Sequence, residues 1–226
     1  MNEVLFIAAM FGIFISVMII AKFFGKEGLI AFVAIATVLA NIFVTKQVNI
    51  LGFNTTLGSI TFSSIFLCTD IISEVYGFKE SKKAVKIGFM FAVIFIIATQ
   101  VVIAFEPNSM DLVQDSMMSL FGISLRTTLA SLVMFFASNI SDVYLFAFLK
   151  KKFPNSLWLR NNISTILCNG IENFLFVYAA FIGIYSAQEC LEIALTTCLF
   201  EVIISICDTP FVYWGRKIAK VDEKRV

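Results

Sequence analysis

Residues 4–21 read VLFIAAMFGIFISVMIIA, a stretch without a single charged side chain. A helix needs about 20 apolar residues to cross the roughly 30 Å hydrocarbon core of a bilayer. The residues before this stretch, Met1-Asn2-Glu3, lack the basic region of a signal peptide, and Lys22-Phe23 offers no small-residue cleavage site. Residues 4–21 therefore predict a membrane-spanning helix that is retained in the protein.

The rest of the chain repeats this pattern. Hydrophobic residues make up 59% of the 226 residues and charged residues only 15%, against roughly 45–50% and about 25% in soluble domains. We predict an all-α, polytopic membrane helix bundle of six to seven transmembrane helices in a single transmembrane domain. The predicted spans are approximately 4–21, 28–45, 55–76, 86–105, 124–148, 157–184 and 190–214. The third is the weakest, because residues 49–64 are rich in Asn, Ser and Thr.

Composition excludes several classes of function. A net charge of +1 gives no basic surface for nucleic acid, and the absence of histidine removes His-based catalysis and metal binding. The five cysteines contain no C-x-x-C pair, so we expect neither a metal site nor a disulfide framework. Nucleotide-binding and hydrolase motifs are missing too. We therefore expect no enzyme activity and no cofactor.

The distribution of basic residues predicts orientation, because Lys and Arg favour cytoplasmic loops. Fourteen of the 17 Lys and Arg residues fall in 22–27, 77–86, 149–156 and the tail after Gly215. We therefore expect a multi-pass protein of the bacterial cytoplasmic membrane, with the C-terminus cytoplasmic and, for seven spans, the N-terminus outside. Residues 106–123 form the long external loop.

Six acidic residues fall within the predicted spans, where ionisable groups are costly and usually mark functional sites. They are Asp70, Glu74, Asp142, Glu172, Glu201 and Asp208. The spacing of Asp70 and Glu74, and that of Glu201 and Asp208, puts each pair on one helix face. We interpret Glu74 as structural or interfacial, because a run of lysines follows it, and Arg126 as an anchor at the membrane surface.

Two spans carry the same pattern, N-x-x-[acid]-x-x-x-F. It consists of Asn139, Asp142 and Phe146 in one span and Asn169, Glu172 and Phe176 in the other. The helix limits place Asn139, Asn169, Glu172 and Glu201 near the membrane midplane, where transporter sites are commonly built. Asp70, Asp142, Asp208 and Arg160 fall in the cytoplasmic half. We predict a shared polar cavity, in which Phe146 and Phe176 could sandwich a flat ligand.

A structural interpretation of these residues stays open. An intramembrane asparagine can simply hydrogen-bond a neighbouring helix. Arg160 could form a structural ion pair with Asp142 or with Asp70. Glu201 could be protonated and hydrogen-bonded to another helix.

Several stretches together resemble the queuosine precursor transporter family. They are 48–56 (VNILGFNTT), 66–70 (FLCTD), 74–77 (EVYG), Arg126 with Ala130-Ser131, Ser138-Asn139 and Asp142, Leu157-Trp158-Leu159-Arg160, Ser164, Asn169, Glu172, Thr209-Pro210 and Tyr213. The resemblance covers about residues 45–214, and the first helix looks like an N-terminal addition to a six-span family. The family commonly has Asp where this chain has Glu172, and Lys where it has Glu201.

The resemblance implies uptake of a 7-deazaguanine base for salvage into the queuosine of tRNA. A guanine-like edge presents two parallel N–H donors, which a carboxylate such as Glu172 or Asp142 accepts, while Asn139 and Asn169 can both donate and accept. Because Glu172 and Glu201 have no lysine beside them, we expect an aminated base, queuine or 7-aminomethyl-7-deazaguanine, to be preferred to the neutral cyano precursor. The predicted substrate-binding residues are Asn139, Asp142, Asn169, Glu172, Glu201, Asp70, Arg160, Phe146 and Phe176.

Other functions remain open from sequence alone. They are a carrier for another small purine-like or cationic solute, a substrate-binding membrane subunit of an ATP-driven complex, and a membrane enzyme. Proton coupling through Glu172 or Glu201 and facilitated diffusion followed by metabolic trapping are both compatible with the sequence. We expect a small-molecule substrate and membrane lipid as partners, no nucleic acid, and a homodimer as a candidate assembly.

Overall fold

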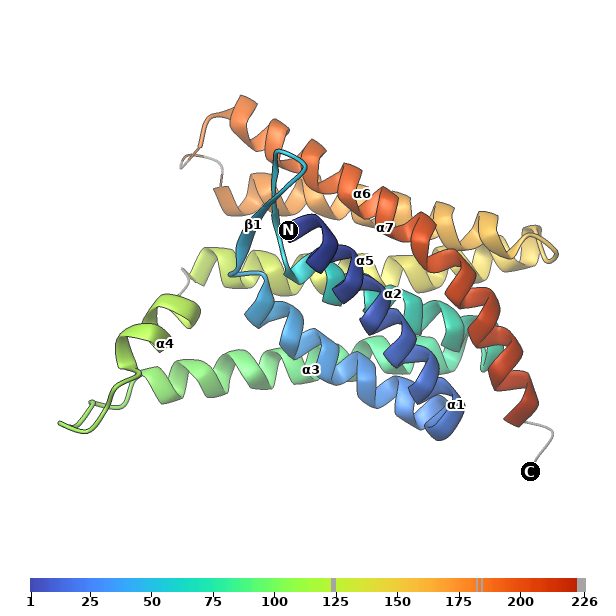
Figure 1. Ribbon diagram of the computed structural model, residues 1–226, viewed down its shortest axis with the longest axis horizontal. Coiled ribbons are helices and arrows are strands. Elements are labelled where there is room, and N and C mark those ends of the chain that lie inside the picture. Colours follow the sequence, from blue (N-terminus) through green and yellow to red (C-terminus); the bar gives the residue numbers. More distant parts are fainter. Residues whose placement is uncertain (123–124, 182, 184, 223–226) are drawn as a thin grey trace.

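The computed structural model describes residues 1–122, 125–181, 183 and 185–222 and shows a bundle of long helices with one short hairpin (Figure 1). Side chains at 54, 125–129, 181 and 220–222 lie outside the description, so the predicted role of Arg126 does too. The elements are α1 (Asn2–Phe43), β1 (Gln47–Ile50), β2 (Phe53–Thr56), α2 (Gly58–Val75), α3 (Phe78–Ile103), α4 (Gln114–Phe121), α5 (Leu125–Lys152), α6 (Leu157–Phe181) and α7 (Ala187–Asp222).

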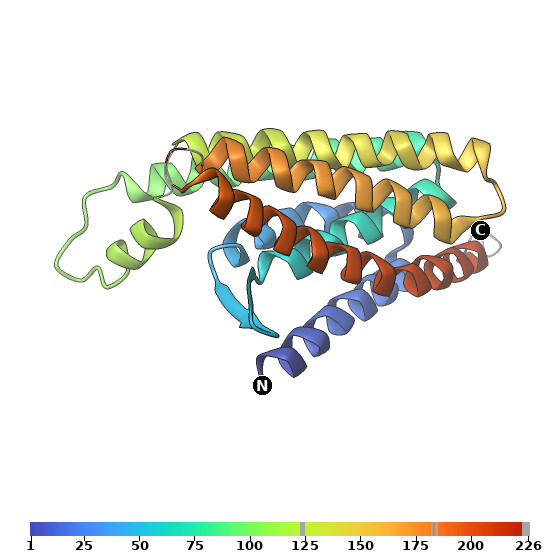
Figure 2. The ribbon, with the colours of Figure 1, turned by 90° about the horizontal axis from the view of Figure 1, so that it is seen from above.

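Six of the described helices, α1, α2, α3, α5, α6 and α7, are long and apolar enough to cross a membrane. The 42 residues of α1 would extend about 63 Å as a straight helix, twice the thickness of the hydrocarbon core. Instead the backbone leaves the helical conformation at Gly25, and the second arm turns back at an angle to the first (Figures 1 and 2). The two arms correspond to the first two predicted spans. How all seven segments sit in a bilayer stays a prediction.

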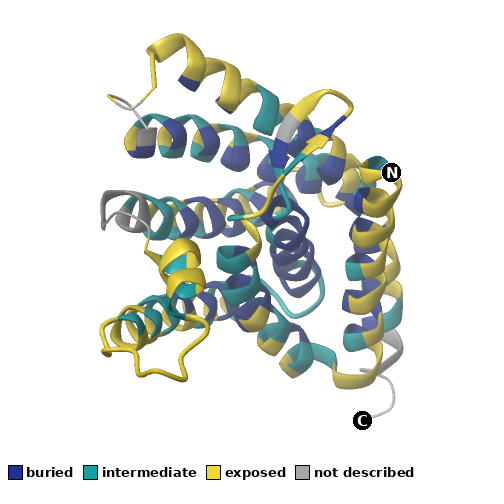
Figure 3. Cartoon of the chain, turned by 60° about the vertical axis from the view of Figure 1, so that its left-hand side comes forward, coloured by how far each residue is buried: buried dark blue, intermediate teal, exposed yellow. Residues whose placement is uncertain are grey.

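The polar stretch that weakened the third predicted span has two structural explanations. Residues 47–50 and 53–56 form an antiparallel hairpin in which Gln47 pairs with Thr56, so the helix begins only at Gly58. The helix that follows, α2, is the most buried span, with 83% of its residues inside the protein. It packs against α1, α3, α5 and α7, and Figure 3 shows it as a largely dark-blue, buried helix inside the bundle. Polar residues are tolerated in α2 because they face protein rather than lipid.

The helices also extend beyond the predicted spans at their charged ends. Helix α3 begins at Phe78, eight residues before the predicted span, and α7 continues to Asp222. The predicted spans end where the apolar residues end. Lys and Glu are good helix formers, so a helix can continue past that point into water.

The basic segments gather at one end of the bundle. The bend at Gly25, the α2–α3 junction, the α5–α6 loop and the C-terminal end of α7 lie on the right of Figure 1. The N-terminus lies beside the hairpin, where the Asn2 side chain donates to the Asn49 carbonyl over 3.3 Å. We call the end that carries these four segments the basic end.

The fold of α1 provides a direct test. Gly25 has φ 56° and ψ −139°, a conformation that costs other residues about 1–3 kcal/mol. An added Cβ would approach the Tyr76 hydroxyl only to 3.6 Å, so the cost of Gly25→Ala is conformational rather than steric. We expect Gly25→Ala to lower the midpoint of unfolding in detergent. Gly12→Ala in the same helix is the matched control, because a Cβ there meets no atom within 4 Å. Equal midpoints for the two variants would contradict the bend.

Candidate functional site

Three aspartates from three helices converge inside the bundle. Asp70 of α2, Asp142 of α5 and Asp208 of α7 are fully buried, and the carboxylate of Asp70 interacts electrostatically with the other two. We call these three residues the aspartate cluster. Neither oxygen of Asp70, and one oxygen each of Asp142 and Asp208, has a hydrogen-bond donor among the described residues. Buried carboxylates left in this state are costly, and a proton or a ligand with donor groups would stabilise them.

Helix α6 supplies the donors that hold the cluster. Asn161 donates through Nδ2 to Oδ1 of Asp208 over 2.8 Å, and the Thr165 hydroxyl donates to Oδ1 of Asp142 over 3.4 Å. Both α6 residues are buried. The carboxylates of α5 and α7 are therefore joined through α6.

A proline inside α7 lies beside further contacts with α6. Pro210 lies inside α7 and removes one backbone N–H of the helix. At the preceding residue, the Thr209 hydroxyl accepts from Nδ2 of Asn162 over 2.6 Å and from Nδ2 of Asn161 over 3.3 Å. Side chains of α6 thus bind α7 beside its proline.

Two glutamates form a second acidic group. The buried Glu201 of α7 accepts from Nδ2 of Asn173 over 2.5 Å and interacts electrostatically with Glu172 of α6. Glu172 is half-buried, and its carboxylate lies near the Ser138 hydroxyl of α5. We call Glu172 and Glu201 the glutamate pair.

Unpartnered amide oxygens accompany these acids. Asn139 of α5 donates to the Phe135 carbonyl over 2.9 Å, which leaves its Oδ1 without a donor. The Oδ1 atom of Asn169 and the Ser138 hydroxyl are also buried without a described partner. The thiol of Cys168 interacts electrostatically with Asp142, Asp70 and Glu172, so it lies between the two acidic groups. Acceptors dominate this region, and they suit a ligand that presents N–H donors.

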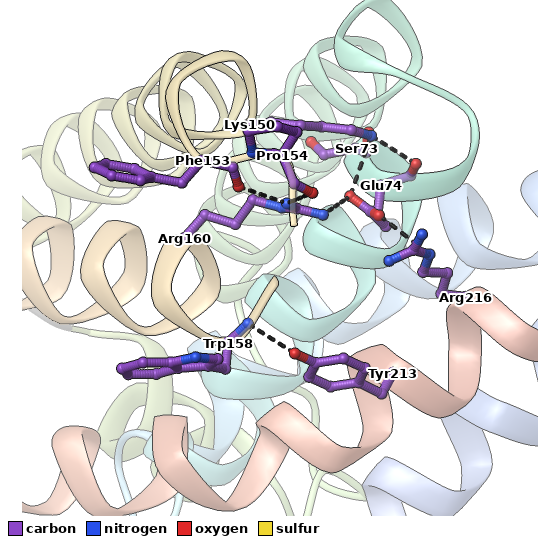
Figure 4. Close-up of polar contacts among 9 residues, drawn as sticks. All are labelled: Ser73, Glu74, Lys150, Phe153, Pro154, Trp158, Arg160, Tyr213 and Arg216. Atoms are coloured by element: carbon purple, nitrogen blue, oxygen red, sulfur yellow. Dashed lines mark hydrogen bonds and ion pairs between the residues drawn. The ribbon is translucent and has the colours of Figure 1, made fainter. Parts of the chain in front are cut away.

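Arg160 does not join the predicted cavity. Its guanidinium donates through NH2 to Oε2 of Glu74 over 2.7 Å and through NH1 to the carbonyls of Phe153 and Pro154 (Figure 4). The structure thus pairs Arg160 with Glu74 rather than with Asp142 or Asp70. The structural interpretation of Glu74 agrees with this pairing.

The two phenylalanines of the repeated pattern lie at different depths. The guanidinium of Arg160 stacks over the Phe146 ring at 5.6 Å. Phe176 follows Arg160 by sixteen residues on α6, which corresponds to about 24 Å of helix rise. It packs against Val177 and its neighbours. The structure does not bring the two rings together, so a ligand sandwiched between them has no support.

Comparison with known proteins now identifies the family. Residues 56–215 match the family described as "Putative vitamin uptake transporter". The chain belongs to this family. It is 38% identical over 213 residues to the "Probable queuosine precursor transporter" of Bacillus subtilis (strain 168), with 93% of each chain covered. It is 28% identical over 170 residues to the "Queuosine precursor transporter" of Escherichia coli (strain K12), with 74% of this chain and 75% of the relative covered. No solved structure matches it.

The family match includes every predicted site residue, whereas α1 lies outside it. The Bacillus relative, however, aligns over 93% of this chain and therefore extends into α1. The relative therefore shares at least part of α1 with this chain.

Three further polar residues of α6 contact these acids. Asn161, Thr165 and Asn173 bind acids of the site, yet none was among the predicted residues. Together with Asn169 they recur every four residues along α6, a spacing that places them on one helix face. That spacing was visible in the sequence. Within the described part of the chain, no group of three or more Cys, Asp and Glu side chains is arranged to hold a metal ion.

Proposed function

We propose that this protein imports a 7-deazaguanine base, a precursor of queuosine, for salvage into tRNA. The family, the names of both relatives and the six apolar helices support this proposal. The observation that carries it is the surplus of buried acceptors without donors around Glu172. A guanine-like edge offers N1–H and an exocyclic amine as adjacent donors, which pair with a carboxylate and neighbouring amide oxygens.

We further propose that the basic end is cytoplasmic. Lysines and arginines favour the cytoplasmic side, and four segments rich in them gather at this end (Figure 1). The C-terminus is then inside and the N-terminus, beside the hairpin, outside. The substrate moves from the hairpin end toward the basic end.

The charges of the site favour a cationic substrate. In the glutamate pair, Glu201 accepts from the Asn173 amide, and no cation contacts either glutamate among the described residues. Arg160, the buried cation of α6, binds Glu74 instead. A buried carboxylate is stabilised by an opposite charge. Queuine and 7-aminomethyl-7-deazaguanine each carry an amine that is protonated at neutral pH. We therefore propose that Glu201 lies near this ammonium group and Glu172 near the guanine edge.

Glu172→Gln tests the assignment of the guanine edge. This change keeps the shape of the side chain but replaces one acceptor by a donor that faces the donors of the substrate. Hydrogen bonds to charged groups contribute about 1.5–3 kcal/mol, so uptake at low substrate concentration is expected to fall about 10- to 100-fold. The measurement is uptake of labelled 7-aminomethyl-7-deazaguanine into proteoliposomes that contain the purified variant.

Glu192→Gln is the control for this experiment, because Glu192 is exposed near the N-terminal end of α7. It is expected to transport like the wild type. A monodisperse Glu172→Gln protein with wild-type uptake would show that Glu172 does not contact the base.

Glu201→Lys tests the assignment of the ammonium group. The new cation would repel an aminated base, so uptake of queuine and 7-aminomethyl-7-deazaguanine should fall at least about tenfold more than uptake of 7-cyano-7-deazaguanine. Glu192→Lys makes the same charge change at an exposed position and should leave the ratio unchanged. Equal losses for the three bases would contradict the assignment.

A further inference from the structure

A single carboxylate joins four helices at the basic end. Glu74, at the end of α2, is 5% exposed and contacts three cations among the described residues (Figure 4). Its Oε2 atom lies 2.7 Å from NH2 of Arg160 on α6 and 3.1 Å from Nζ of Lys150 on α5. Its Oε1 atom lies 3.4 Å from Nε of Arg216 on α7. We call these four residues the Glu74 network.

Two cations of the network also donate hydrogen bonds to backbone carbonyls. Nζ of Lys150 donates to the carbonyls of Ser73 and Glu74 over 3.1 Å and 2.7 Å, at the C-terminal end of α2. A cation there also interacts favourably with the helix dipole. Arg160 holds the α5–α6 loop through the carbonyls of Phe153 and Pro154. The network therefore fixes the end of α2 against α5, α6 and their connecting loop.

The network lies between the aspartate cluster and the basic end. Glu74 follows Asp70 by four residues, Lys150 follows Asp142 by eight, and Arg216 follows Asp208 by eight. These separations correspond to about 6–12 Å of helix rise in the same direction. Phe146 is fully buried, and its ring lies against the guanidinium of Arg160, between the aspartate cluster and the basic end. A solute that moved from the aspartate cluster toward the basic end would therefore meet Phe146 and the network.

The charges explain how such a barrier can open. One buried carboxylate balances three cations, so its loss leaves cations that repel one another and an arginine that is 1% exposed without its anion. The closed arrangement depends on one side chain of α2, whereas the cations come from α5, α6 and α7. Movement of α2 away from these helices would break all three ion pairs together.

We propose that the Glu74 network is the inner gate of the transport pathway, closed in this structure. The proposal rests on the proposed transport function, but on no choice of substrate. Opening separates Glu74 from Arg160, Lys150 and Arg216 and exposes the aspartate cluster to the basic end.

Cys168 provides a reporter inside the gate. Its thiol lies near Asp142, Asp70 and Glu172, beyond the network as seen from the basic end, and Cys168 is 8% exposed. The starting protein keeps Cys168 and carries alanine at the other cysteines, Cys68, Cys190, Cys198 and Cys207. The probe is a membrane-impermeant cationic methanethiosulfonate, applied in separate samples to each face of sealed vesicles.

Glu74→Gln is expected to raise the rate at which Cys168 is modified from the basic end at least about tenfold. Arg216→Gln removes one of the three cations, and Arg216 is only half-buried, so this change should raise the modification rate less than Glu74→Gln does. Glu80→Gln is the matched control, because it breaks the Lys26–Glu80 ion pair, 3.2 Å at the same end, outside the network. It should leave the rate unchanged.

A second reporter distinguishes opening from general loosening. Cys190 is fully buried near the opposite end of α7, in a small cluster with Val177 and Ala194. In a protein that keeps only Cys190, Glu74→Gln should not change the rate of modification. An equal rise at Cys190, access to Cys168 gained from the opposite face alone, or a Cys168 rate unchanged by both network variants would overturn the gate. These measurements need no substrate, so failure of the gate and failure of the proposed substrate are separable.

Discussion

An ionised side chain inside a membrane protein is costly unless an opposite charge or a hydrogen-bond donor stabilises it. The structure depends on how this cost is met at each buried acid. Glu74 is matched by Arg160, Lys150 and Arg216, and these ion pairs join four helices. The aspartate cluster, by contrast, accepts hydrogen bonds from the neutral side chains of Asn161 and Thr165, and no described cation forms an ion pair with it. An unpaired buried charge is costly. Glu74, which is paired with cations of this chain, therefore fits the role of a contact that closes the pathway, and the unpaired aspartates fit the role of a region that binds a ligand.

The central position of α2 makes this division possible. Its residues are almost all buried, so it can carry Asp70 and Glu74 one turn apart without exposing either acid to lipid. Asp70 faces the interior acids and Glu74 faces the cations of the basic end. One helix therefore links the proposed binding region to the proposed gate, and a shift of α2 would act on both.

The sequence predicted what depends on hydrophobic length and helical spacing. It indicated the helix bundle, the buried acids and the segregation of basic segments. It did not predict the partner of Arg160, because the relative depth of α2 and α6 decides whether Glu74, Asp70 or Asp142 lies opposite that guanidinium. It also missed the hairpin at 47–56, where pairing between two short strands replaces the start of a predicted helix. The asparagine and threonine face of α6 was predictable from its four-residue spacing and was overlooked.

Transport by this chain alone is the central claim, and reconstitution tests it most directly. The purified wild-type protein in proteoliposomes should take up 7-aminomethyl-7-deazaguanine in a saturable manner that queuine inhibits, and guanine should enter at least about tenfold more slowly. Binding of the base without uptake would show that the chain is a subunit that needs another protein to move the substrate. Equal uptake of guanine would show that the buried acids do not recognise the amine.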